Sequence, residues 1–118
     1  MFLTFATSID LVRVPAGALV CITADGNYST IFMADSSEHV VTLQLGQIER
    51  RIAELIGPDD NRFIRIGKSL IVNRDYICYI NAPRQRLVLS DSRTFRRELS
   101  ASRDALKALK EYFEKENL

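Results

Sequence analysis

Three cations precede the first acid in one short stretch of the sequence, RFIRIGKSLIVNRDYI at residues 62–77. Arg62, Arg65 and Lys68 are interleaved with bulky apolar residues, in the way that polar residues line the wet face of a half-buried strand. A strand needs polar side chains on that face, but it does not need all of them to be positive. A polyanionic ligand would need this, and the stretch therefore indicates phosphate recognition.

Residue types that usually carry catalysis or bind metals are sparse in this chain. The single histidine, His39, stands at an expected strand start without a cysteine or carboxylate pattern around it, and we expect it to be exposed. Gly67-Lys68-Ser69 ends like a nucleotide-binding phosphate loop, but Arg62 occupies the position where such a loop has its first glycine. We expect no enzyme activity, no cofactor and no metal site.

The net charge of +1 conceals an uneven distribution of charge along the chain. Residues 1–61 hold three arginines against eight acids, whereas residues 62–110 hold twelve cations against four acids. Such asymmetry favours a nucleic acid or an anionic membrane as partner. From charge alone, a solvated β surface with arginines chosen for solubility is an equal alternative. The membrane ranks third, because the cations lie on expected strands and no amphipathic helix is mainly basic.

The elements that must position these cations are mostly short strands. Apolar runs with turn residues between them predict strands over residues 2–6, 11–14, 19–22, 28–33, 39–43, 62–66, 69–72, 76–80, 86–89 and 94–99. Leu45, Ile48 and Ile52 begin an apolar stripe at helical spacing, which Gly57-Pro58 stops. A terminal helix is expected after Ser102, which is a plausible N-cap.

Length and composition bound the class of protein. The 118 residues suit one domain over 1–118, and no apolar run approaches the roughly 18 residues that a membrane span needs. Cys21 and Cys78 lie in alternating apolar stretches, where a single cysteine is usually a small buried hydrophobe. We expect a protein of the cytoplasm, a reducing compartment.

Several of these segments together resemble the LytTR DNA-binding domain of bacterial response regulators, from about Leu11 to Tyr112. The segments are ALVCITADGNYSTIFMADS, IERRIAEL, RFIRIGKSLIVNRDYICYI, LVLSDSRTF and SRDALKALK. The most specific are Asp25-Gly26-Asn27-Tyr28 and the spacing of Phe63, Arg65, Ser69, Val72 and Asn73. The resemblance implies a mainly β fold, an elongated arrangement of small antiparallel sheets with two short helices. It also implies a transcription regulator of a two-component system, docked through loops in successive major grooves.

The resemblance implies a DNA-binding set drawn from three segments. These are the turn between two central strands, the arginine-bearing strand with its loop, and the start of the last helix. The residues are Asn27, Tyr28, Ser29, Arg65, Gly67, Lys68, Ser69, Ser102, Arg103 and Lys107. Cations and hydroxyls among them could contact phosphates, while Asn27 or Lys68 could reach base edges. Local alternatives remain: Asn27 as a positive-φ turn residue, Ser69 as a strand start and Ser102 as a cap.

The implied partner is double-stranded DNA with repeated half-sites, bound by a dimer, with no membrane partner. Family members usually receive their signal from an attached domain, so a sensor or receiver could be supplied by another chain or a missing domain. Two departures, Gly67 and Lys68, stand where many members carry histidine and asparagine or arginine. The near-zero net charge and Gly67 would permit an alternative function, a protein-interaction module of the same fold with weak or lost DNA binding.

Overall fold

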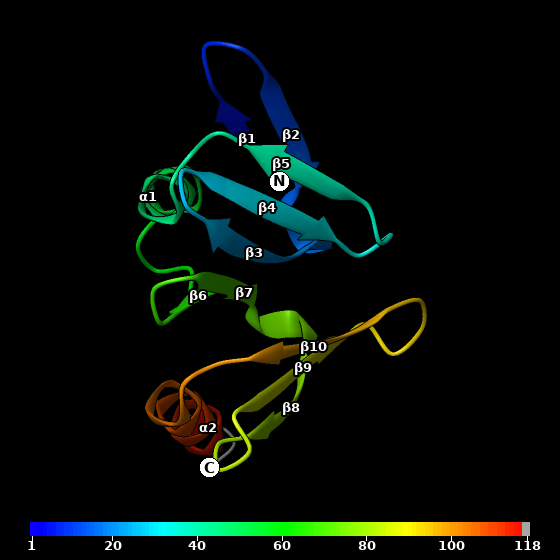
Figure 1. Ribbon diagram of the computed structural model, residues 1–118, viewed down its shortest axis with the longest axis vertical. Helices are drawn as coiled ribbons and strands as arrows, with labels where there is room; N and C mark the ends of the chain where they lie inside the picture. Colours follow the sequence, from blue (N-terminus) through cyan, green and yellow to red (C-terminus); the bar gives the residue numbers. More distant parts are fainter. Residues whose placement is uncertain (117–118) are drawn as a thin grey trace.

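The computed structural model describes residues 1–116 and is built mainly from strands (Figure 1). The strands are β1 (Phe2–Ala6), β2 (Leu11–Pro15), β3 (Leu19–Asp25), β4 (Tyr28–Met33), β5 (Glu38–Val41), β6 (Phe63–Ile66), β7 (Leu70–Asn73), β8 (Ile77–Asn81), β9 (Arg86–Ser90) and β10 (Arg96–Ser100). Two helices, α1 (Leu45–Ile56) and α2 (Arg103–Glu116), and two single 3₁₀ turns, η1 (Ala16–Ala18) and η2 (Arg74–Tyr76), complete the described chain. The expected strands and helices are confirmed, with boundaries shifted by a few residues.

The strands form three separate antiparallel sheets. β1 pairs with β2, the five-stranded sheet has the order β5-β4-β3-β7-β6, and the three-stranded sheet has the order β10-β9-β8. The molecule measures 43 × 28 × 27 Å, and its sheets follow one another along the longest axis (Figure 1). The expected elongated arrangement of small antiparallel sheets is confirmed.

The first of two cores lies between α1, the β1–β2 hairpin and the five-stranded sheet. The stripe of α1 buries Leu45, Ile48 and Ile52 against Leu3 and Phe5 of the hairpin. At the start of α1, the Gln44 backbone N–H donates to Gln47 Oε1 at 2.8 Å, which satisfies a group that the helix leaves unpaired. The helix stops at Gly57, whose φ of +88° suits glycine. The position of α1 is therefore set by core packing, by the Gln44–Gln47 bond at its start and by Gly57 at its end.

The second core joins the other face of the central strands to the three-stranded sheet and α2. Leu87 and Leu89 of β9 pack there with Leu106 and Leu109 of α2. Ser102 caps α2 as expected, its Oγ accepting from the Ala105 N–H at 3.2 Å. The cap alternative for Ser102 is thus confirmed. Because this core spans two sheets, it holds the start of α2 in place relative to β6 and β7.

Three sequence expectations are corrected by the structure. Gly26, with φ of +62°, supplies the positive-φ position of the β3–β4 turn, and Asn27 does not. Cys78 is exposed because the β8–β9 register shifts between Ile77 and Tyr79, a bulge that breaks the alternation. His39 is half-buried on β5 instead of exposed. A periodic strand pattern cannot foresee a bulge, since one extra residue reverses the side to which each following residue points.

Within residues 1–116, neither helix has the length and apolar character needed to cross a membrane. The described residues also contain no cluster of three or more His, Cys, Asp or Glu side chains that could hold a metal ion.

Candidate nucleic-acid interface

Three segments that are distant in sequence lie on one side of the molecule. Figure 1 shows the β3–β4 turn, the β6–β7 turn and the start of α2 at the left, one below another along the long axis. The first two are directly bonded, because the Ala24 N–H donates to the Ser69 carbonyl at 2.9 Å. These segments contain all the residues of the expected DNA-binding set except Arg65, which stands just before the β6–β7 turn on β6.

The β6–β7 turn presents Lys68 at the surface. Gly67 has φ of +63°, in the region where glycine carries no steric cost, and no atom lies within 4 Å of where a Cβ would stand. The glycine is therefore required by backbone conformation and not by crowding within the chain. Lys68 and Ser69 are exposed, and among the described residues the Lys68 ammonium has neither an ion pair nor a hydrogen bond. Its charge remains free for a ligand.

Arg65 folds back onto the turn that follows it. Its Nε donates to the Gly67 carbonyl at 3.0 Å and its Nη2 to the Lys68 carbonyl at 2.9 Å. Its Nη1 meets Glu49 Oε1 of α1 at 3.0 Å, and only 28% of the Arg65 side chain is exposed. Five N–H donors are present on a guanidinium, so two remain for another acceptor. The side chain therefore shapes the loop.

The β3–β4 turn places its candidate residues in different environments. Asn27 is exposed, and its Oδ1 accepts from Gln44 Nε2 at 3.2 Å. Tyr28 is 52% exposed. Ser29 is fully buried and its hydroxyl donates to the Leu43 carbonyl at 2.8 Å. A side chain without exposed area cannot contact a phosphate, so Ser29 is withdrawn from the surface set as a correction. Its position in phase with Ile31 along β4 was the signal for burial.

The start of α2 is the third segment on this side of the molecule. Together with the β3–β4 turn and the β6–β7 turn, it forms what we call the row. Ser102, Arg103 and Lys107 are all exposed, and Arg103 makes only a long contact of 3.5 Å with the Pro83 carbonyl. The Ser102 oxygen accepts the capping bond, which leaves its hydroxyl proton available to an anion. Asp104 is also exposed in the first turn, where a carboxylate interacts favourably with the positive end of the helix dipole. The start of α2 thus has two cations and a free hydroxyl close to one acid.

Contacts at the other end of α2 hold the helix against the segments that flank β6 and β7. The Tyr112 hydroxyl accepts from Asn61 Nδ2 at 2.6 Å and from Arg74 Nη1 at 3.2 Å. Arg74 also forms an ion pair with Glu116. An apolar groove lies between β6 and α2, lined in part by Ile64 and Ala108. These contacts join the loop before β6, the segment after β7 and the last helix into one scaffold.

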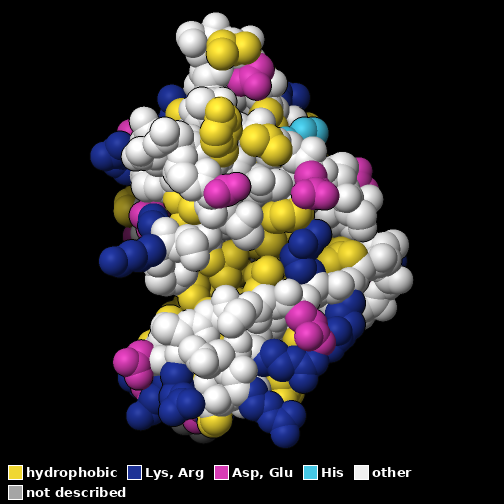
Figure 2. All heavy atoms as spheres, viewed as in Figure 1, with side chains coloured by type: hydrophobic (Ala, Val, Ile, Leu, Met, Phe, Trp, Pro, Cys, Tyr) yellow, Lys and Arg dark blue, Asp and Glu magenta, His cyan; other side chains and the backbone are white. Residues whose placement is uncertain are grey.

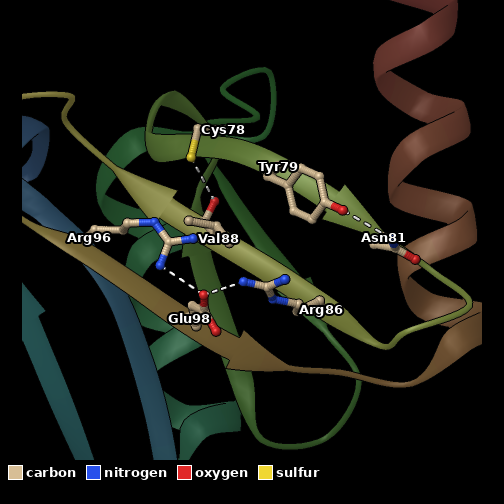
Figure 3. Close-up of polar contacts among 7 residues, drawn as sticks. All are labelled: Cys78, Tyr79, Asn81, Arg86, Val88, Arg96 and Glu98. Atoms are coloured by element: carbon tan, nitrogen blue, oxygen red, sulfur yellow. Dashed lines mark hydrogen bonds and ion pairs between the residues drawn. The ribbon is translucent and has the colours of Figure 1, made fainter.

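A second group of cations lies elsewhere, on the outer face of the three-stranded sheet. Figure 2 shows Lys and Arg side chains gathered over the lower part of the molecule, where Figure 1 places β8–β10 and α2. In Figure 3, Arg86 and Arg96 flank Glu98, with Tyr79 beside Arg86. Arg96 Nη1 is 2.8 Å from Glu98 Oε1, and Arg86 binds the same oxygen. The bond from Arg86, reinforced by that from Arg96, lowers the pKa of the Glu98 carboxyl.

The structure therefore divides the basic segment that the sequence showed as one. Among residues 1–116, the ammonium groups of Lys68 and Lys107 on the row have no ion-pair partner, whereas Arg86 and Arg96 share a carboxylate on the outer face. Arg97 is also engaged, with its guanidinium 3.9 Å from the centroid of the Phe32 ring. The surface set that remains after Ser29 is Asn27, Tyr28, Arg65, Gly67, Lys68, Ser69, Ser102, Arg103 and Lys107.

Comparison with known proteins identifies a family and solved structures of similar fold. A family model described as the LytTr DNA-binding domain matches residues 10–114. Among solved structures, the chain is similar to the LytTr DNA-binding domain of a Bacillus cereus protein described as a methyl-accepting/DNA response regulator. The two share 20% sequence identity with a TM-score of 0.61, over 93% of this chain and 94% of that one. No curated protein matches the sequence.

Proposed function

The chain belongs to the LytTR family of DNA-binding domains, and from this premise we propose that it binds duplex DNA sequence-specifically as part of a bacterial transcription regulator. The observation that carries the proposal is the row of three segments on one side of the molecule, with the Lys68 ammonium, which has no partner within residues 1–116, near its middle. Free cations release counterions from DNA when they meet phosphates, and this supplies affinity without sequence preference. Specificity must then come from side chains that reach base edges.

Lys68 is the proposed base reader of the row. It projects from a turn whose glycine has no side chain to hold the duplex away, so the backbone can approach the groove closely. A lysine in the major groove donates to the O6 and N7 acceptors of guanine. Arg103 and Asn27 are the next candidates, because they stand at the two ends of the same row. The Asn27 amide retains its two N–H donors, since only its oxygen is bonded to Gln44.

The remaining residues of the row are proposed to contact the DNA backbone. Lys107 supplies charge, and the hydroxyls of Ser69, Ser102 and Tyr28 donate to phosphate oxygens. One helical turn of the duplex separates the centres of two half-sites by about 34 to 36 Å. The 43 Å length of the molecule exceeds this distance, which allows segments on one side to enter successive major grooves.

We propose further that the whole chain 1–118 acts as one domain in the cytoplasm, with two copies on repeated half-sites. A receiver or sensor on another chain or an additional domain would deliver the signal. Large exposed apolar side chains at one end of the molecule, namely Phe2, Ile9, Leu11 and Val40, offer a surface for such a protein. They also keep the alternative of a protein-interaction module open as a second candidate.

Binding-site selection from random duplexes tests the proposal directly. The purified chain should enrich a defined sequence, and titration should show at least about a thousandfold preference for it over scrambled duplex, within the range of specific regulators. Enrichment of no sequence, together with weak binding to all duplexes, would favour the protein-interaction module. The same selection with Ser29→Ala should give an unchanged logo, because that side chain is buried.

A further inference from the structure

We propose that Glu49 of α1 and Arg65 of β6 act as a positioning pair, which holds the β6–β7 turn in the conformation that reads DNA. The inference rests on the proposed function, which it deepens by assigning a specificity role to an acid. Glu49 belongs to none of the segments of the expected DNA-binding set. It is placed there only by the fold, sixteen residues away from its partner in sequence.

The bonds from Arg65 define the direction in which Lys68 points. The Gly67 carbonyl belongs to the peptide plane before the Lys68 Cα, and the Lys68 carbonyl belongs to the plane after it. Arg65 donates to both, at 3.0 and 2.9 Å. When both flanking peptide planes are held, the φ and ψ of Lys68 are set, and with them the direction of its Cα–Cβ bond. The Ser69 carbonyl is held too, by the Ala24 N–H of β3.

Glu49 orients the guanidinium that makes these bonds. The guanidinium is a rigid planar fork, so fixing Nη1 on Glu49 Oε1 at 3.0 Å also fixes the directions of Nε and Nη2. Both partners are partly exposed, with 28% of the Arg65 side chain and 49% of the Glu49 side chain accessible. Exposed ion pairs contribute little to folding stability. We therefore assign to this pair the orientation of the guanidinium, and not a contribution to folding stability.

The same helix also holds the β3–β4 turn. Gln44, at the start of α1, donates to Asn27, and Glu49 lies one to two turns further along the helix. α1 is packed into the first core by Leu45 and Ile48, which lie beside these two polar residues in sequence. One rigid helix therefore braces two of the three segments of the row. This gives α1 a role in DNA recognition although none of its side chains is a candidate contact.

The proposal makes a prediction opposite to that of charge alone. Glu49 lies close to a surface that should face phosphates, so simple electrostatics predicts that its removal raises affinity for every duplex. If Glu49 instead keeps the turn in order, its removal lowers affinity for the selected site while binding to random duplex stays equal or rises. A turn that is competent one third to one tenth of the time weakens specific binding about threefold to tenfold.

Three variants of α1 separate the two effects. Glu49→Ala removes the charge and the acceptor, and Glu49→Gln removes the charge but keeps an oxygen that can accept from Arg65. Glu54→Ala is the matched control, because Glu54 is an exposed acid of the same helix whose carboxylate has no bond in the described residues. We expect the ratio of selected-site to random-duplex affinity to fall in Glu49→Ala, to recover in Glu49→Gln and to be unchanged in Glu54→Ala.

A measurement without DNA makes the result independent of the proposed function. The ¹⁵N order parameters of Lys68 and Ser69 should fall from the rigid range near about 0.85 toward about 0.6 in Glu49→Ala and in Arg65→Lys, but not in Glu54→Ala. If Glu49→Ala tightens binding to all duplexes and leaves these order parameters unchanged, the positioning role is wrong. If the parent chain prefers no duplex, the proposed function fails, and the order parameters alone decide whether the pair positions the turn.

Discussion

Two basic regions of this molecule differ in whether their charges are available. On the row, the ammonium of Lys68 and that of Lys107 have no partner among the described residues. On the outer face of the three-stranded sheet, Arg86 and Arg96 converge on one oxygen of Glu98 (Figure 3). Along the sequence both regions belong to a single stretch of excess positive charge. On the row, the free cations stand on the Gly67 turn and at the capped start of α2.

This difference shows that counting basic residues in a segment does not locate a DNA interface. A cation already paired with a carboxylate must break that pair, or bring the acid with it, before it can neutralise a phosphate. A free cation releases a counterion at no such cost. The row and the outer face can therefore be tested against each other, residue by residue.

The largest effect should come from salt. With about five to eight phosphate contacts, affinity for the selected duplex should fall roughly a hundredfold to ten-thousandfold between 50 and 200 mM salt. Replacing Lys107 by Ala should reduce the slope of log affinity against log salt by about 1. Replacing Arg96 by Ala should leave the slope unchanged. Fluorescence anisotropy titrations at four salt concentrations measure both slopes, and equal slopes for the two variants would remove the distinction between the regions.

Lys68→Ala should produce the next largest effect. Loss of a contact worth about 1 to 3 kcal/mol lowers affinity for the selected site by about fivefold to 150-fold and relaxes the preference at one or two adjacent base pairs. Arg86→Ala, the matched removal of one cation on the outer face, should change affinity less than about twofold. Binding-site selection on both variants is the measurement. A logo for Lys68→Ala identical to that of the parent would move base reading to Asn27 or Arg103.

A smaller effect is expected from thiol protection. Cys78 lies on the outer face and is exposed, whereas burial raises the pKa of the Cys21 thiol to about 12, so only Cys78 should react in the native chain. A saturating concentration of the selected duplex should leave the rate at which Cys78 reacts with a thiol reagent unchanged. A cysteine introduced in the row by Ser69→Cys, in a Cys78→Ser background, should react about tenfold more slowly when the duplex is bound. Protection of Cys78 by duplex would show that DNA covers the outer face.

The smallest effect concerns pH and the two acids of the three-stranded sheet and its turn. Bonds from Arg86 and Arg96 lower the Glu98 pKa, and the Thr94 hydroxyl with nearby backbone N–H groups lowers the Asp91 pKa. A carboxyl with a lowered folded-state pKa stabilises the fold above its unfolded-state pKa, and this contribution is lost as pH falls through the folded-state value. The melting temperature should therefore decline below about pH 4.5, and less steeply in Glu98→Gln. Identical profiles for variant and parent would show that Glu98 contributes nothing to the pH dependence.

Much of the fold could be predicted because its signals are local. The stripe of Leu45, Ile48 and Ile52 predicts α1 from helical periodicity alone, and Gly57 marks its end by backbone conformation. Ser102 caps α2 through its own oxygen, which accepts from a backbone N–H only three residues further along the chain. Gly67 marks a turn, since its conformation is closed to most other residues. In each case, the residues that cause the structure are within a few positions of one another.

The candidate site was predicted less completely because its contacts are long-range. Ser29 was expected at the surface with its neighbours, but it points inward in phase with Ile31. Cys78 was expected inside, but a bulge turns it outward. Glu49 was not among the expected residues at all, because nothing near it in sequence marks it as the partner of Arg65.

The sequence by itself determined which segments are strands, helices and turns, where the excess positive charge lies, and which family pattern the residues follow. Those properties depend on residue type and on spacing within one turn or one strand. Only the tertiary structure decided which cations stay free and which are paired, because Glu98 reaches Arg86 across the sheet and Glu49 reaches Arg65 from another element. Pairing depends on distances between side chains that packing brings together, and no local pattern specifies those distances.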